Sequence, residues 1–119
     1  MGLLISCGSP SVSRSLEVTT IRYDTTNLTE CGGEVKNISP HAINNLQLEV
    51  EFQNADGNRV RTSTANISPS SLAANAIGSF SVPYQRGSND PPVVRCRVVE
   101  FQSEGVQLAF EDDSPAALR

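Results

Sequence analysis

Three cysteines and one histidine are the side chains of this 119-residue chain with the most scope for chemistry beyond packing. Thiols can carry a lipid, pair as a disulfide, bind a metal or act as nucleophiles, and imidazole is a common base and metal ligand. His41 follows a proline in a turn-like segment, and no second ligand lies at metal-binding spacing from it. Neither Cys31 nor Cys96 has a histidine beside it in the sequence to activate its thiol. We therefore predict no catalytic residue, no metal site and no cofactor.

The segment before Cys7 has the pattern of a lipid-attachment site. Leu4-Ile5-Ser6-Cys7 resembles a bacterial lipobox, in which small and aliphatic residues precede the cysteine whose thiol takes a diacylglycerol. A Ser-rich tether, residues 8–15, follows it. However, no basic residue precedes Cys7, whereas a signal peptide has a basic segment and an apolar stretch of about 7–15 residues. Either the natural start lies upstream, or the start has been altered, or the match is accidental and Cys7 is a free thiol near a frayed end.

The composition limits the classes of partner. The formal net charge is −4, and Lys36 is the only lysine, so the chain has no electrostatic attraction for nucleic acid or for an anionic membrane. No apolar run approaches the 18 or so residues of a transmembrane helix. We expect contact with a membrane only through a lipid on Cys7.

The alternation of apolar and polar residues predicts strands throughout the chain, with no helix. The clearest strand is 45–53, in which Leu46, Leu48, Val50 and Phe52 face one way. The expected strands are 16–23, 30–38, 45–53, 59–65, 77–84, 93–101 and 106–112. The expected core consists of Leu46, Leu48, Val50, Phe52, Phe80, Val94, Val98, Leu108 and Phe110.

Strands with one apolar face must stack face to face, so we predict an all-β, immunoglobulin-like sandwich of two antiparallel sheets with about seven strands. The sandwich would span residues 16–112, between a signal remnant with its tether (1–15) and a disordered tail (113–119). Residues 54–58, with the sequence NADGN, form either a tight hairpin turn or part of a calcium loop. We favour the hairpin because a calcium loop needs more ligands and a distal glutamate.

The central part of the chain, residues 32–82, resembles the bacterial FxLYD-type domain. The first part of that pattern is matched by Gly33, Val35 and Asn37, the second by Val50, Phe52 and Gly57, and the third by Leu72 and Phe80. The usual Pro-Gly after the leucine is replaced by Ala74-Asn75, and asparagine tolerates the left-handed backbone conformation that glycine would supply. The resemblance implies an immunoglobulin-like sandwich of the kind found in envelope lipoproteins, generally without catalytic activity.

Cys31 and Cys96 are expected to form an intramolecular disulfide. Each lies on the apolar face of its own strand, and their separation resembles that of the inter-sheet disulfide of immunoglobulin domains. In an oxidising compartment such a pair would bond. The alternative is two separate buried thiols.

These features favour a non-catalytic binding or structural module of the bacterial cell envelope, periplasmic or surface-exposed, that contacts another envelope protein or complex. Its interaction surface would be an edge strand, because edges offer unpaired backbone groups for strand addition. The expected edge consists of Val60, Arg61, Thr62, Ser63 and Thr64. A soluble periplasmic carrier of a metal or another small ligand is the alternative function. Four arginines, Arg59, Arg61, Arg95 and Arg97, form either a basic stripe or separate solvated positions.

Overall fold

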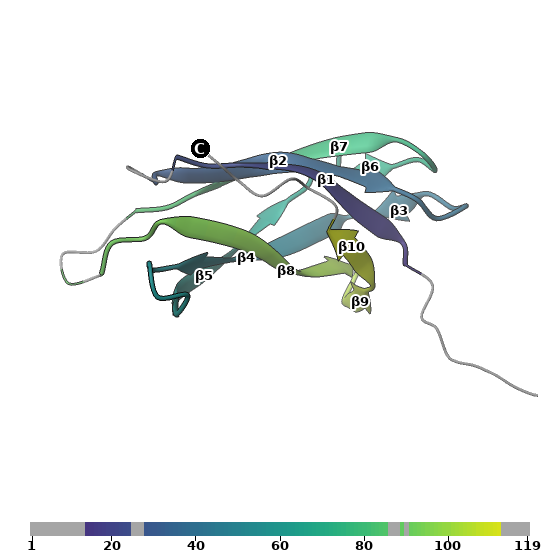
Figure 1. Ribbon diagram of the computed structural model, residues 1–119. Helices are drawn as coiled ribbons and strands as arrows, with labels where there is room; N and C mark the ends of the chain where they lie inside the picture. The colour runs from purple at the N-terminus through teal and green to yellow at the C-terminus, as the bar shows by residue number, and fades with distance from the viewer. Residues whose placement is uncertain (1–13, 25–27, 86–88, 90, 113–119) are drawn as a thin grey trace, which may run out of the picture.

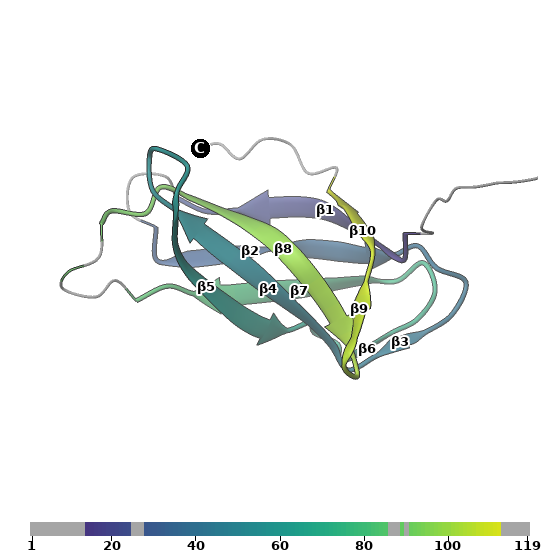
Figure 2. The ribbon, with the colours of Figure 1, turned by 90° about the horizontal axis from the view of Figure 1, so that it is seen from below.

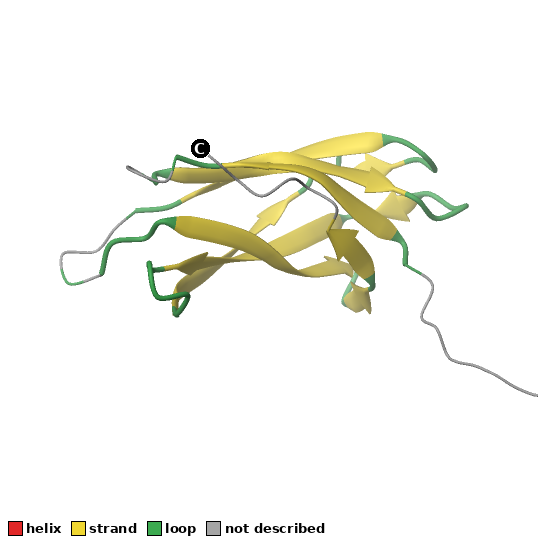
Figure 3. Cartoon of the chain, viewed as in Figure 1, coloured by secondary structure: helices red, strands yellow, loops and turns green. Residues whose placement is uncertain are grey.

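The computed structural model describes residues 14–24, 28–85, 89 and 91–112. Every regular element in these residues is a β-strand, which confirms the all-β prediction (Figure 3). The described part of the chain contains no helix that is long and apolar enough to cross a membrane. Cys7, most of the predicted tether and the tail 113–119 lie outside the described residues.

Two four-stranded sheets pack face to face (Figure 1). One sheet has the strand order β10-β1-β2-β7, and the other has the order β5-β4-β8-β9. A pair of two-residue strands, β3 and β6, lies at one end. The strands within the described residues are β1 (Leu16–Arg22), β2 (Glu30–Asn37), β3 (Ile43–Asn44), β4 (Leu46–Gln53), β5 (Arg59–Asn66), β6 (Ser71–Leu72), β7 (Ile77–Pro83), β8 (Arg95–Ser103), β9 (Val106–Leu108) and β10 (Phe110–Asp112).

Each of the seven expected strands is present, and the last of them contributes to both sheets. Its first half, β9, pairs with β8, and its second half, β10, pairs with β1. The chain therefore crosses from one sheet to the other at Ala109 and joins the two sheets along one side of the sandwich (Figure 2). The β1–β10 pair is parallel, which differs from the expected antiparallel sheets, because the crossing strand enters the second sheet in the direction of β1.

A β-bulge in β8 decides which of its residues face the core. Val50 is opposite Val98 and Glu49 is opposite Glu100, so Val99 is an extra residue in β8. Beyond the bulge the alternation is reversed, and Phe101 is fully buried. Simple alternation from Cys96 would place Phe101 on the outer face, so Phe101 is absent from the expected core.

Three members of the expected core differ in position from the prediction. Val94 is only partly buried, because β8 begins at Arg95 and the alternation does not extend into the preceding loop; Val93 is buried instead. Leu108 and Phe110 are partly buried, and they pack against the margin of the core where the chain crosses between the sheets. The Phe110 ring contacts Phe101 edge-on, with ring centroids 5.1 Å apart. The other six expected core residues are buried.

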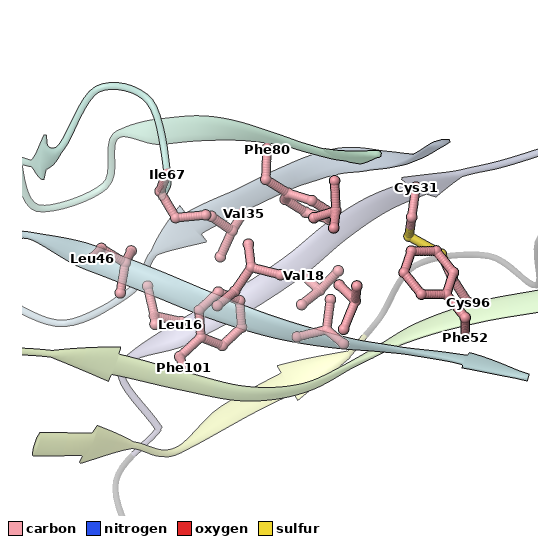
Figure 4. Packing of buried hydrophobic residues seen from close by; sticks show 14 of the residues in the cluster. Leu16, Val18, Cys31, Val35, Leu46, Phe52, Ile67, Phe80, Cys96 and Phe101 are labelled. Atoms are coloured by element: carbon pink, nitrogen blue, oxygen red, sulfur yellow. A yellow bond between two sulfur atoms is a disulfide. The ribbon is translucent and has the colours of Figure 1, made fainter. Parts of the chain in front are cut away.

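Cys31 in β2 and Cys96 in β8 form a disulfide between the two sheets, as predicted. Figure 4 shows the bond at one end of the core, beside Phe52. Both cysteines are almost completely buried. The disulfide therefore links the two sheets within the apolar layer that they share.

The residues that carry the FxLYD-type resemblance have definite structural roles. A Cβ atom on Gly33 would lie 2.2 Å from the carbonyl oxygen of Thr20, so only glycine fits where β1 and β2 approach. Asn75 has a φ of 68°, which confirms that asparagine replaces glycine in the turn before β7. The hairpin at residues 54–58 is also confirmed, because the side chain of Asn54 accepts hydrogen bonds from the backbone N–H groups of Asp56 and Asn58.

Asn37 is a fully buried polar residue whose side chain joins three segments. Its Nδ2 donates to the carbonyl oxygens of His41 and Leu72, each at 2.8 Å. Its Oδ1 accepts from the backbone N–H and the hydroxyl of Ser39. The end of β2, the following turn and β6 are thus held together by one side chain whose hydrogen bonds are all satisfied.

The disulfide should contribute a large part of the stability. We expect the double variant Cys31→Ala/Cys96→Ala to lower the free energy of unfolding by about 4 kcal/mol, because the disulfide restricts the unfolded chain. Urea denaturation of the two proteins would measure the difference. Cys7→Ser is the matched control and should leave the stability unchanged, and thiol counting under denaturing, non-reducing conditions should find only the Cys7 thiol. Detection of three free thiols after aerobic purification would contradict the pairing.

Removal of the Asn37 side chain should also destabilise the fold. We expect Asn37→Ala to lower the free energy of unfolding by about 3 kcal/mol, because it leaves the buried Leu72 carbonyl and the partly buried Ser39 N–H without these partners. Asn66→Ala, at an exposed position of β5, serves as the control and should change the stability by less than about 0.5 kcal/mol. Equal midpoints of chemical denaturation for the two variants would show that the Asn37 network has no special role.

Candidate interaction edge

The two sheets share the final segment of the chain on one side of the sandwich and end in separate strands on the other side. The crossing at Ala109 joins the sheets on one side, where β9 and β10 are only three residues each. On the opposite side the terminal strands are β5 in one sheet and β7 in the other, and these two strands contact each other. Within the described residues, the long strand edges are therefore those of β5 and β7.

The free edge of β7 is largely blocked. Ser68 and Ser79 exchange backbone hydrogen bonds at 2.9 Å, so the segment before β6 covers the middle of β7. Pro83, at the end of the strand, has no N–H group to donate. A covered middle and a terminal proline are features that discourage pairing with another strand.

The free edge of β5 has no such cover among the residues that the structure describes. The backbone N–H of Ile67 donates to Leu46 O. With the register of the two strands, this bond shows which residues of β5 are hydrogen-bonded to β4. Arg61 and Ser63 therefore direct their N–H and C=O groups toward β4. Thr62 and Thr64 direct theirs away from it. The unpaired backbone groups of this edge thus include those of Thr62 and Thr64.

The five residues of the expected edge have different roles. Val60 is the extra residue of a β-bulge and packs partly against the core. Arg61 lies on the inner side of β5, where its guanidinium stacks 5.1 Å from the Tyr84 ring and donates to Gln85 O at 2.6 Å. The sequence alternation did not indicate this contact, which fixes β5 to the segment after β7.

On the outer face of the β5-β4-β8-β9 sheet, polar side chains of β5, β4 and β8 lie opposite one another in rows that run across the strands. The rows, in order along the strands, are Asn66, Gln47 and Gln102; then Thr64, Glu49 and Glu100; then Thr62, Glu51 and Arg97; and finally Arg59, Gln53 and Arg95. The four arginines do not form a continuous stripe, because β4 separates β5 from β8 and Arg61 faces inward.

The row that contains Glu49 and Glu100 is acidic, and no described residue gives it a cationic partner. The two glutamates are directly opposite each other on β4 and β8, an arrangement in which like charges repel. Glu51 in the next row lies 4.0 Å from Arg97, but no described Lys, Arg or His side chain forms an ion pair with Glu49 or Glu100. Glu49 and Glu100 line a small hollow of about 50 Å³ together with Gln47, Gln102 and Thr64.

A larger, open hollow of about 710 Å³ lies on the other sheet. It forms at Gly32, which has no side chain to fill the space between Arg22 on β1 and Ser81 on β7. Glu30 accepts a hydrogen bond from the Ser81 hydroxyl at its margin. Burial raises the pKa of the neighbouring Tyr23 phenol above its usual value, while the charge of Arg95 acts in the opposite direction.

His41 lies on the exposed turn after β2, and its backbone carbonyl accepts the hydrogen bond from Asn37. In the part of the chain that the structure describes, no three His, Cys, Asp or Glu residues group in a way that could hold a metal ion. Cys31 and Cys96 are engaged in the disulfide.

The sequence matches no family model, and no curated protein matches it at a significant level. The structure is similar to that of IrmA from Escherichia coli, with a TM-score of 0.50 and 13% sequence identity. The similarity covers 87% of this chain and 93% of that chain. At this identity the likeness concerns the fold alone.

Proposed function

We propose that this protein is a non-catalytic binding module of the bacterial cell envelope, which docks an envelope protein by strand addition at β5. The observation that carries the proposal is the free edge of this eight-residue strand, where Thr62 and Thr64 present unpaired backbone donors and acceptors. Strand addition obtains its affinity from such groups and its specificity from alternate side chains.

Rigidity of the edge supports this proposal. Arg61 ties β5 to the segment after β7, and the ladder to β4 runs along the strand from Arg59 to Asn66. A preorganised edge loses little conformational entropy when a partner strand binds. The resemblance to the FxLYD-type domain, found in envelope lipoproteins, and the disulfide, which suits an oxidising compartment, support the proposed location.

A carrier of a small ligand is the second candidate function, and the hollow at Gly32 favours it. The hollow is open to solvent, whereas typical ligand pockets bury most of the surface of their ligand. Ligand binding there would shift the backbone amide resonances of Gly32 and Ser81, whereas strand addition would shift those of Thr62 and Thr64. Nuclear magnetic resonance spectra with and without a ligand therefore distinguish the two functions.

A proline on the edge tests strand addition. We expect Thr64→Pro to weaken capture of a partner from envelope extracts at least tenfold with little change in melting temperature, because the N–H that it removes is unpaired. Ser63→Pro is the matched control: it removes an N–H that bonds to β4, and we expect a loss of stability of about 2 kcal/mol. Normal capture by Thr64→Pro would show that the edge assignment is wrong. Turnover of a substrate that His41→Ala abolishes would refute the binding-module proposal itself.

The lipid anchor is a separate part of the proposal and has its own test. Mass spectrometry of the membrane fraction of the native host should find Cys7 acylated and at the mature N-terminus, because its thiol would take the diacylglycerol. An unmodified peptide that spans Ser6 and Cys7 in the mature protein would exclude the anchor, but it would not affect the proposal that β5 is a docking edge.

A further inference from the structure

The acidic row beside the free edge indicates the chemistry of the partner. We propose that the strand that adds to β5 carries lysine or arginine on its outer side, next to Thr64, and small apolar residues on its inner side. This inference rests on the proposed function, since it describes the partner of the same edge.

The distance from the edge to the acidic row requires a long side chain on the partner. A strand added to β5 would lie about 4.8 Å from it and therefore about 10 Å from β4. Thr64 is short and exposed, and Glu49 follows it in the same row on β4. A long, flexible side chain opposite Thr64 can extend over the threonine to the Glu49 carboxylate, whereas a short side chain cannot.

The charge of the acidic row favours a cationic side chain on the partner. Glu49 and Glu100 are directly opposite each other, and no described cationic side chain pairs with either of them. Gln102, which is uncharged, donates from its Nε2 to Glu100 Oε2 at 2.7 Å. A cationic group from the partner would relieve the repulsion between the two carboxylates as well as form new contacts. Complementary charge of this kind gives specificity and faster association.

The inner side of the edge has a different character. Of the inward-facing residues Arg61, Ser63 and Ala65, Ala65 is apolar and packs partly against the core, as does Val60 at the bulge. An apolar residue of the partner beside Ala65 would extend the core between the sheets. The preferred partner strand therefore alternates basic and apolar residues, with the basic residues toward the acidic row.

A second copy of this chain does not meet this requirement. Antiparallel pairing of two β5 strands about Ser63 would place Thr64 of one copy opposite Thr62 of the other. Glu49 of the first copy and Glu51 of the second would then lie in one row, with the positive charge of Arg97 beyond them. Thr62 is short and uncharged, so a second copy would leave Glu49 and Glu100 without a cationic side chain opposite Thr64, whereas a basic strand from another protein supplies one.

Two short peptides test the inference directly. One alternates valine with lysine, and the other has glutamate in place of each lysine. We expect the lysine peptide to shift the amide resonances of Thr62 and Thr64 in the ¹⁵N-labelled protein and to bind at least tenfold more tightly than the glutamate peptide at low salt. The preference should disappear in 1 M NaCl, because screening at that concentration acts within about 3 Å.

Two double variants complete the experiment. Glu49→Gln/Glu100→Gln should abolish the preference for the lysine peptide, because it removes the acidic row without changing the size of either side chain. Glu34→Gln/Glu111→Gln removes the same charge from the other sheet and should retain the preference.

The possible failures are distinguishable. Equal binding of both peptides with shifts at Thr62 and Thr64 would overturn the inference and leave the edge intact as a docking site. No shift at these residues with either peptide would overturn both the inference and strand addition. A concentration-dependent dimer in sedimentation experiments that Thr64→Pro abolishes would show that the occupant is a second copy, which also overturns the inference.

Discussion

Burial of two apolar sheet faces in a single shared layer is the constraint on which the rest of this structure depends. Neither sheet is stable with its apolar face in water, so the two must pack together, and the Cys31–Cys96 disulfide links them inside the layer. The details of the strands follow from this requirement. The bulge at Val99, for example, turns Phe101 into the core, where alternation alone would expose it.

The same constraint leaves one side of the sandwich open. The final strand crosses at Ala109 and pairs with both sheets, which joins them on one side. The described residues include no equivalent crossing on the other side, where β7 and β5 are the terminal strands. The segment around Ser68 covers part of β7, but no described residue covers the edge of β5. Exposed edges tend to pair with other chains, so an uncovered edge next to an uncompensated acidic row is a natural position for recognition.

Polar groups that are buried and polar groups that are exposed have different roles here. Asn37 is fully buried, satisfies all its hydrogen bonds and fixes the turn and β6 to the end of β2. Arg61 orders the edge strand from its inner side by contacts with Tyr84 and Gln85. Glu49 and Glu100 are partly exposed on the outer face and repel each other, so their charge is available to a partner. The first two residues build the framework, and the last two give one face its chemical character.

The sequence by itself determined the fold class, the positions of the seven main strands, the turn at 54–58 and the pairing of the two cysteines. These properties depend on local alternation, turn residues and the placement of both thiols on apolar faces, all of which can be read along the chain. The tertiary structure alone decided the burial of Phe101, the inward position of Arg61 and the meeting of Glu49 with Glu100. Each of these depends on a bulge or on the order of strands in a sheet, and an insertion of one residue in a strand reverses the facing of every residue after it. The sequence identified Val60 to Thr64 as an edge, but only the phase of the ladder with β4 showed that Thr62 and Thr64 carry its free backbone groups.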